Sequence, residues 1–399
     1  MNPPELPGNA AGAQQAATEP KAADQAANAH RGTTKKVRVG IIGTGGIAAA
    51  HAQALADGGA ELVVAVDIDP VRAKDFAASW GIAATAASLE EAARPGLDVV
   101  AICTPPSSHA LLAKEALALG LNAVVEKPPA LSLRELKDLQ EAEAASGKSV
   151  SCIFQHRFGG AAQKLERLQR SGALGKPLTG YCNTLWFRDQ AYFDVPWRGQ
   201  WDVEGGGPTM GHGIHQFDLL LHLWGPWQEV TAFAGRLARR TETEDVSMAV
   251  VRFESGALST VINSVISPRE TSQLRFDYEN ATVEVEHLYG YDDSHWRFTP
   301  APGMEHLQEL WDADTSQGTS GHAAQYRRIL AALAAGTPET AKPPVTLSDA
   351  YATMELAAGI YSSAITGQTV RSGSITEGNP FFDRADGRLE PWKLETSNA

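Results

Sequence analysis

The sequence predicts an α/β protein with a doubly wound parallel sheet in its N-terminal part and an open, mostly antiparallel sheet in its C-terminal part. From Val37 onward, short apolar runs alternate with helical patterns, which is typical of parallel strands joined by crossover helices. After about residue 155 the runs become longer and alternate apolar with polar residues, as antiparallel strands do. The length of 399 residues exceeds one ordinary core. We therefore predict domains over 35–155 and 156–375, a tail over 1–34 and an extension over 376–399.

The first domain is expected to alternate strands and helices throughout. Asp69 and Pro70 supply an N-cap and a first-turn proline, and Gly120 ends a later helix. Ser88 with Glu91, and Ser132 with Glu135, predict two capping boxes. The expected strands are 37–42, 62–66, 97–103, 123–126 and 149–154, and the main helices between them are 46–56, 70–79 and 108–119.

The second domain is expected to hold one broad sheet. Two late helices, at about 322–335 and 348–366, should return to cover the junction between the domains. The expected strands are 178–187, 229–237, 246–253, 257–264, 273–278 and 281–287, preceded by a helix near 162–169.

Composition narrows the classes of partner. The net charge of -13 disfavours nucleic acid and anionic membranes, since both would be repelled, and no apolar stretch approaches the ~18 residues of a membrane span. The three cysteines, Cys103, Cys152 and Cys182, lack the spacing of a disulfide framework or a thiolate zinc site, which favours a reducing cytoplasm.

The N-terminal tail has almost no large apolar side chains. Residues 1–34 are therefore expected to be disordered, with a helical, Ala-rich interaction arm as the alternative. Glu5 precedes every basic residue and no continuous apolar stretch follows, so a signal peptide is not expected.

A dinucleotide site is predicted between the first strand and the first helix. Glycines in this position let backbone amides approach a pyrophosphate at the positive end of a helix. Asp67 ends the second strand, near the ~20-residue spacing at which an acid binds the ribose hydroxyls. A tight turn would explain the glycines and a solvated loop would explain Asp67, but neither explains both. Asp67 would repel a 2′-phosphate, which favours NAD, while Arg72 keeps NADP open. The loop residues are Gly43, Thr44, Gly45, Gly46 and Ile47.

Two further strand ends carry candidate residues at the same edge of the sheet, where open parallel sheets bind ligands. Thr104, Pro105 and His109 could line the nicotinamide, although His109 could equally cap or pack the first helical turn. Glu126 and Lys127 follow the next strand, where an ammonium group can polarise a substrate oxygen. The alternative for Lys127 is a surface ion pair.

Two segments of this part, GTGGIAAAH and AICTPPSSHALLAKEALALGLNAVVEKPPALSLREL, resemble the Gfo/Idh/MocA family of oxidoreductases. The resemblance covers roughly residues 36–375. It implies a Rossmann domain joined to an α+β domain with an open antiparallel sheet. It also implies that Lys127 serves the catalytic site and contacts the cofactor, and that the bond between Lys127 and Pro128 is cis.

The stretch from Gly205 to Asp218 resembles the family segment that carries a catalytic histidine. His215 takes that position, and an imidazole with a pKa of about 6.5 can accept an alcohol proton at neutral pH. Four residues earlier the family often has an aspartate, where this chain has Gly211. Either His212 or Asp218 compensates for the missing acid, or the reaction differs.

Substrate-side residues are expected at the edge between the domains. Gln155 and Arg157 match a polar-x-Arg-Phe segment of the family, and Asp218 is expected to bind the substrate with them. A second group combines aromatic rings, which stack on sugar faces, with guanidinium groups, which bind hydroxyl or carboxylate oxygens; a dimer interface or core packing is the alternative. Its members are Trp186, Arg188, Tyr192, Trp197, Arg198 and Trp201.

A metal site is an alternative for the helix that carries His215. His215, Asp218 and His222 share one face, with His212 nearby. His222 lies in the apolar run LLLHLWG and suits a packed histidine, so no metal is expected.

These observations predict an NAD-dependent oxidoreductase that transfers a hydride between nicotinamide and a sugar, a cyclitol or a related polyol or keto compound. A catalytically silent NAD-binding regulator is one alternative, and NAD-dependent elimination or glycoside cleavage through a transient ketone is another. The expected partners are a sugar-like small molecule and further copies of the chain, since long alternating strands leave one sheet face to be covered.

Overall fold

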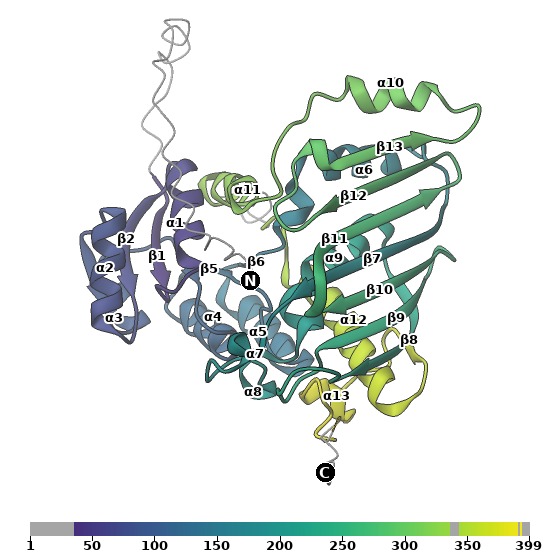
Figure 1. The fold of residues 1–399 in the computed structure, drawn as a ribbon. Helices are drawn as coiled ribbons and strands as arrows, with labels where there is room; N and C mark the ends of the chain where they lie inside the picture. The colour runs from purple at the N-terminus through teal and green to yellow at the C-terminus, as the bar shows by residue number, and fades with distance from the viewer. Residues whose placement is uncertain (1–35, 336–342, 390–391, 393–399) are drawn as a thin grey trace, which may run out of the picture. The chain divides into compact units, whose positions relative to one another are not determined.

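The computed structural model describes residues 36–335, 343–389 and 392 (Figure 1). The predicted tail over 1–34 lies outside these residues, as does most of the end of the predicted extension. None of the described helices is both long and apolar enough to cross a membrane.

The first sheet has six parallel strands in the order β3-β2-β1-β4-β5-β6, which is the order of a Rossmann fold, as predicted. Apolar residues of β1 and β4 are buried on both faces because helices cover both sides. The strands are β1 Arg38–Ile42, β2 Glu61–Val66, β3 Ala84–Ala86, β4 Val99–Ile102, β5 Asn122–Val125 and β6 Val150–Cys152. The helices are α1 Ala48–Asp57, α2 Pro70–Trp80, α3 Leu89–Ala93, α4 His109–Ala118 and α5 Leu133–Ser146, with the 3₁₀ turn η1 Pro106–Ser108 before α4.

Helix starts follow the predicted caps with one difference. Asp69, Ser88 and Ser132 accept hydrogen bonds from the first turns of α2, α3 and α5. Glu91 and Glu135 do not return to the cap residue; each carboxylate accepts from the backbone N–H of the residue before the cap. The predicted capping boxes are therefore wrong in their second half, because each Glu carboxylate is taken up by the N–H one residue before the cap.

The second sheet has eight strands in the order β13-β12-β11-β7-β10-β9-β8-β14. The prediction of a mostly antiparallel sheet is confirmed, but the central β7–β10 pair is parallel. The two strands run the same way because helices and the β8–β9 hairpin intervene between them. The strands are β7 Pro177–Phe187, β8 Trp227–Gly235, β9 Val246–Phe253, β10 Leu258–Ser264, β11 Ile266–Tyr278, β12 Ala281–His287, β13 Trp296–Pro300 and β14 Val370–Arg371.

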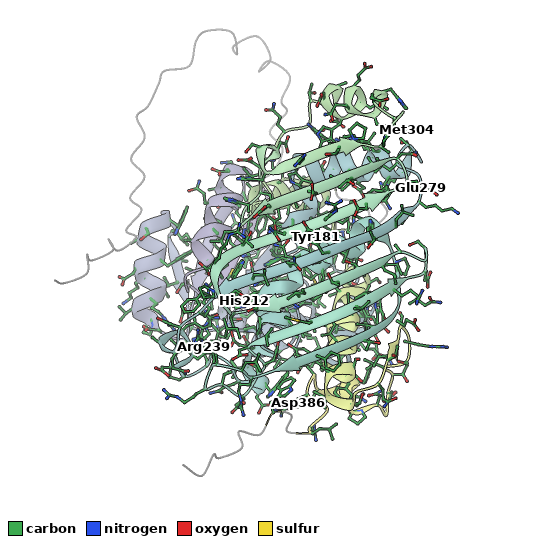
Figure 2. The ribbon with its side chains drawn as sticks, turned by 45° about the vertical axis from the view of Figure 1, so that its right-hand side comes forward. Tyr181, His212, Arg239, Glu279, Met304 and Asp386 are labelled. Carbon is green, nitrogen blue, oxygen red and sulfur yellow. The ribbon has the colours of Figure 1, made fainter. Side chains whose placement is uncertain are left out.

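Helices cover one face of this sheet, and no described helix covers the other, which we call the bare face. Figure 2 shows the bare face with Tyr181 near its middle and α12 behind the strands. Residues of β8 and β9 alternate between buried and exposed, as one covered face requires. The elements are η2 Gln155–Phe158, α6 Gly160–Arg170, α7 Gln190–Phe193, α8 Trp201–Glu204, η3 Thr209–Gly213, α9 Ile214–Trp224, η4 Asp293–His295, α10 His306–Ala313, α11 His322–Ala335, α12 Leu347–Thr366 and α13 Pro380–Asp383.

The late helices pack on elements of both domains, as expected for helices that cover the junction. α11 packs on α1, and its Tyr326, Ile329 and Leu330 join the core formed by β1 and α1. α12 packs against β8, α9 and α5. α13 is held to α5 by ion pairs from Arg134 to Asp383 and Glu377, so the described part of the C-terminal extension is attached to the fold.

Candidate active site

The candidate site lies where the carboxyl ends of β1, β2, β4 and β5 meet. Parallel strands bring their carboxyl ends to one edge, so residues far apart in sequence become neighbours there. Gly43 follows β1, Asp67 follows β2, Thr104 lies just beyond β4, and Lys127 lies just beyond β5.

The loop after β1 has the features of a pyrophosphate cradle. Gly43 has a φ of 85°, and a Cβ there would lie 2.7 Å from Thr104 Cγ2 and 2.9 Å from Thr104 N, so only glycine fits. Space is open around Gly45 and Gly46, where a Cβ would meet nothing within 4 Å. α1 begins directly after this loop, at Ala48, with no side-chain cap, so the positive end of the helix lies at the loop. The predicted residues thus fit a dinucleotide.

Asp67 is prepared to accept hydrogen bonds as a carboxylate. The Thr44 N–H and hydroxyl donate to its Oδ2 at 3.0 and 2.8 Å. Burial raises the pKa of Asp67, but hydrogen bonds from Asp69 N–H, from Thr44 and from Arg72 outweigh it, and the net pKa is lowered. Arg72 was the reason to keep NADP as an alternative cofactor, and its Nη2 donates to Asp67 Oδ1 at 2.9 Å.

His109 links two loops of the site. Its Nδ1 and Nε2 lie 2.7 Å from the carbonyl oxygens of Pro128 and Thr104, and the ring is buried. Both nitrogens are engaged within the protein, so the packing alternative describes this residue better than direct contact with nicotinamide. His109 fixes the loop after β4 against the loop after β5. α4 begins at His109, one residue later than predicted.

Lys127 points from the first domain toward the glycine-rich segment of the second. Its Nζ donates to the carbonyl oxygen of Gly211 at 2.9 Å, and the Lys127–Pro128 bond is cis, as the resemblance implied. Burial lowers the pKa of Lys127, whereas the neighbouring Glu126 carboxylate raises it. The result is a shielded ammonium group at the junction of the domains.

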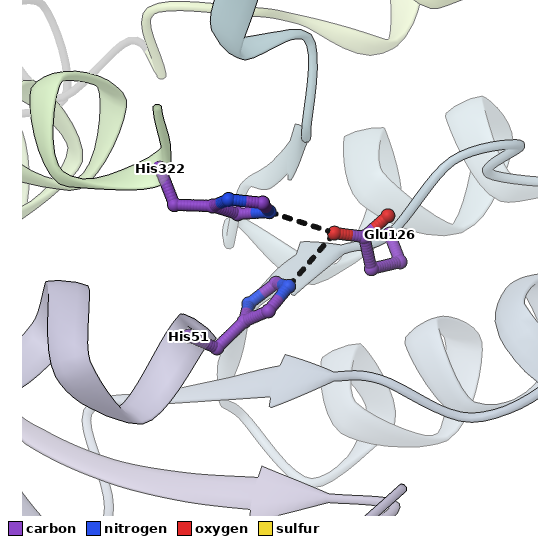
Figure 3. Close-up of side chains that lie close together, drawn as sticks. All are labelled: His51, Glu126 and His322. Atoms are coloured by element: carbon purple, nitrogen blue, oxygen red, sulfur yellow. Dashed lines mark hydrogen bonds and ion pairs between the residues drawn. The ribbon is translucent and has the colours of Figure 1, made fainter. Parts of the chain in front are cut away.

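Glu126 stands between two histidines (Figure 3). His51 Nε2 and His322 Nε2 lie 2.8 and 3.1 Å from its Oε1, and His51 Nδ1 lies 2.6 Å from Tyr326 Oη. Burial raises the pKa of Glu126, but the two histidines hold it well below its usual value. The three side chains bring their ligand atoms within 4.8 Å of one another, yet the carboxylate already binds both rings directly. The group therefore joins α1, the end of β5 and α11.

Among the described residues, His215, Asp218 and His222 do not come together as a metal site. His222 Nε2 lies 3.1 Å from Glu166, and Asp218 binds Arg157, so neither faces His215.

His215 is buried, 3% exposed, and neither ring nitrogen has a hydrogen-bond partner. Burial lowers its pKa well below 6.5, and the positive charge of Lys127 lowers it further. His215 is therefore a neutral imidazole at neutral pH, and no protein group occupies either of its ring nitrogens.

The ring of His212 lies 5.1 Å from that of Trp186 and 6.2 Å from that of Tyr192, with its Nδ1 unpartnered. Space around Gly211 is open, since a Cβ there would meet nothing within 4 Å. Because residue 211 has no acidic side chain, there is room in the site at this position. The Gly211 carbonyl oxygen accepts the hydrogen bond from Lys127 Nζ.

Arg157 and Asp218 were expected to face the substrate, and their contacts run elsewhere. Arg157 Nε and Nη2 donate to Asp218 at 2.7 and 2.6 Å, Thr353 Oγ1 donates to Asp218 at 2.8 Å, and Asp218 is fully buried. Arg157 also pairs with Asp349 at 3.1 Å. Both side chains are used internally, because a buried charge requires a partner. They fasten η2 to α9 and α12.

The aromatic residues and arginines expected on the substrate side have two kinds of surroundings. Arg198 lies over the rings of Trp197 and Tyr192 at 3.8 and 4.4 Å, and Arg188 lies 5.0 Å over Trp186. Both arginines also form ion pairs, with Glu204 and Glu270 respectively. Trp201 is 6% exposed and its Nε1 donates to Glu242 O. It is therefore a core residue, in agreement with the core-packing alternative.

Residues near the site that were not predicted include His51, His322, His156, Tyr289 and Glu244. His51 ends the segment GTGGIAAAH and His156 is the variable position of the polar-x-Arg-Phe segment, but neither carried a spacing signal, and Tyr289 follows a strand without any motif. Gln155, which was predicted, donates to Tyr289 Oη at 2.5 Å. Glu244 accepts from Gly207 N at 2.9 Å and Thr209 N at 3.1 Å, and thus positions the segment that includes Gly211.

Two protein-family profiles match the chain. Residues 37–154 match the profile described as an oxidoreductase family with an NAD-binding Rossmann fold, and residues 162–284 match the C-terminal domain of the same family. The chain therefore belongs to the Gfo/Idh/MocA family, as the resemblance implied.

Relatives and solved structures agree with this membership. The chain is 31% identical to scyllo-inositol 2-dehydrogenase (NAD(+)) of Bacillus subtilis, over 58% of this chain and 68% of that protein. It is 28% identical to 1-carboxy-3-chloro-3,4-dihydroxycyclohexa-1,5-diene dehydrogenase of Comamonas testosteroni, over 57% of this chain but only 58% of the relative's length. The WlbA dehydrogenase of Bordetella pertussis, solved with NADH and UDP-GlcNAcA, is 26% identical and superposes with a TM-score of 0.75 over 84% of this chain and 98% of that one.

Proposed function

We propose that the protein is an NAD-dependent oxidoreductase that transfers a hydride between nicotinamide and a CH–OH carbon of a sugar, a cyclitol or a related polyol. The observation that carries this proposal is the pairing of a shielded ammonium group, Lys127, with an unpartnered imidazole, His215, beside an open dinucleotide loop. The named relatives act on sugar-like or cyclic hydroxyl compounds, which agrees with this class of substrate.

The chain's residues divide the work. Residues 43–47 would hold the pyrophosphate and Asp67 the ribose hydroxyls. NAD, when bound, supplies the hydride acceptor. Lys127 would polarise the reacting oxygen by its positive charge, and His215 would take the alcohol proton on a ring nitrogen that no protein group occupies.

The test is a comparison of cofactor binding with turnover. Lys127→Ala and His215→Ala should keep most of the NADH affinity in isothermal titration, because neither residue lies in the dinucleotide loop. NADH formation from a panel of polyols, including scyllo-inositol, levoglucosan and UDP-GlcNAcA, should fall at least ~100-fold for His215→Ala. His222→Asn is the matched control on the same helix, since His222 pairs with Glu166 instead. Near-full turnover by His215→Ala would refute this mechanism.

A catalytically silent regulator is the second candidate, favoured by Gly211 in place of the usual acid. A wild-type protein that binds NADH but oxidises or reduces nothing in the panel would support it.

We further infer that copies of the chain associate through the bare face of the second sheet. Phe233, Met248 and Val250 are 79%, 53% and 53% exposed there, and Phe233 pairs with Met248 in the strand register. An exposed apolar face of this kind is typical of subunit contacts. Light scattering that gave a monomer at micromolar concentration would contradict this inference.

We propose the cytoplasm as the location of the protein, because its three cysteines are buried free thiols.

A further inference from the structure

His156 is a buried histidine whose ring bonds to nothing. It lies in η2, directly after the last strand of the parallel sheet, and is 1% exposed. Neither Nδ1 nor Nε2 has a hydrogen-bond partner. Buried polar atoms without partners are costly and uncommon, and those that persist call for a ligand or an ordered water.

His156 lies against His215 and two tyrosines. The two imidazole rings lie 5.1 Å apart at 36°, and the rings of Tyr291 and Tyr289 lie 4.9 and 5.5 Å from His156. Both phenols are already bonded, Tyr291 to Gln216 at 2.6 Å and Tyr289 to Gln155 at 2.5 Å. Four unpartnered imidazole nitrogens, two on each ring, therefore remain at this position.

The electrostatics decide what these nitrogens can bind. Burial lowers the pKa of His156 to about 3, with a smaller contribution from the positive charge of Lys127. The ring is therefore neutral at pH 7, with one N–H donor and one nitrogen acceptor. A hydroxyl group also donates one hydrogen bond and accepts others, so it matches a neutral imidazole better than a carboxylate or an ammonium would.

We propose that His156 is a second substrate-binding imidazole, which binds the hydroxyl next to the one whose proton His215 takes, so that the site selects vicinal diols. The inference rests on the proposed function and adds the arrangement of oxygens that the substrate must present. The two rings come from η2 and α9 and their centroids lie 5.1 Å apart, which is close enough for two hydroxyls on adjacent ring carbons of one substrate to reach one ring each.

Two substitutions test the proposal on whichever polyol of the panel is oxidised. His156→Phe should lower kcat/KM at least tenfold for the diol, yet leave kcat/KM for the analogue without the neighbouring hydroxyl nearly unchanged. His156→Asn should recover part of the loss, because an amide both donates and accepts. NADH affinity should be unchanged, and the melting temperature of His156→Phe should stay level or rise, because two unpartnered nitrogens are removed.

Equal losses on diol and deoxy analogue, or no loss on either, would overturn the proposal. A fall in the melting temperature of His156→Phe with unchanged kcat/KM would assign the residue to packing instead. His222→Asn serves again as the control that leaves the rate intact.

A crystal structure of the NADH complex soaked with scyllo-inositol tests the binding without turnover. We expect a ligand oxygen within hydrogen-bond distance of a His156 nitrogen and a second oxygen at His215. If the panel gives no turnover but this contact is present, the proposed oxidation fails and the diol site stands. Water alone at His156, or a His156 ring bonded only to protein, would overturn the diol site.

Discussion

The buried ion pair between Arg157 and Asp218 offers a direct test of whether these residues support the site or bind the substrate. Asp218→Asn keeps the volume and removes the charge, which leaves the 6%-exposed Arg157 with only Asp349, whose side chain is 37% exposed. Removing one partner of a buried pair costs about 3–5 kcal/mol. Because Asp349 remains, we expect the lower end, about 3 kcal/mol.

For a domain of this size a kcal/mol shifts the melting temperature by roughly 2–4 °C, so Asp218→Asn should melt roughly 6–12 °C lower than wild type. Thermal unfolding by circular dichroism measures this shift. Glu286→Gln is the matched control, because its pair with Arg269 is exposed and such pairs contribute about 0–1 kcal/mol. The double variant Arg157→Met/Asp218→Leu should be more stable than Asp218→Asn. A melting temperature within 2 °C of wild type, combined with a large rise in KM, would refute the supporting role and restore the expected substrate contact.

Three further predictions follow from the site. Asp67→Ala should weaken NADH more than NADPH in isothermal titration; equal losses would show that Asp67 does not select the cofactor. His212→Ala should lower kcat, but by less than His215→Ala does, and a fall in stability with unchanged kcat per folded molecule would mean that His212 only packs. Burial raises the pKa of Glu244 to about 7, so its contribution to stability is fully present below about pH 4.5 and is lost as the pH rises through about 7. Glu244→Gln should therefore remove roughly 3 kcal/mol of the stability difference between pH 4.5 and 8, and urea unfolding curves with the same pH dependence in both proteins would contradict this.

Much of the fold could be predicted because local signals and burial agreed. Apolar runs flanked by caps identified β1, β4 and α2, and α11 was placed over its full range of 322–335. The short strands β3 and β14 were missed because two or three residues carry no period. The parallel pairing of β7 with β10 was missed because direction is set by the path of the chain between them.

The positions of site residues could be predicted where a sequence motif determines the backbone. The contacts of a side chain could not, because they depend on residues far away in the sequence. Gly43, Asp67 and Lys127 stand at the expected strand ends. Arg157 lies at the junction, but its contacts with Asp218 and Asp349 were not predicted, because the sequence does not show that these carboxylates meet it. His156 was missed because an absence of partners is visible only in three dimensions.

The packing of α11 on the first sheet has a consequence for how the chain folds. Tyr326 and His51 are in contact although 275 residues separate them, and Gln325 donates to the carbonyl of Cys152 on β6. Contacts of such long range form late, and during synthesis the parallel sheet emerges long before the helix that covers it. Residues 36–155 made alone would expose the apolar surface that Tyr326, Ile329 and Leu330 cover. The cofactor-binding half is therefore completed only when the second half has been made, so a truncated chain would neither fold well nor hold its dinucleotide firmly.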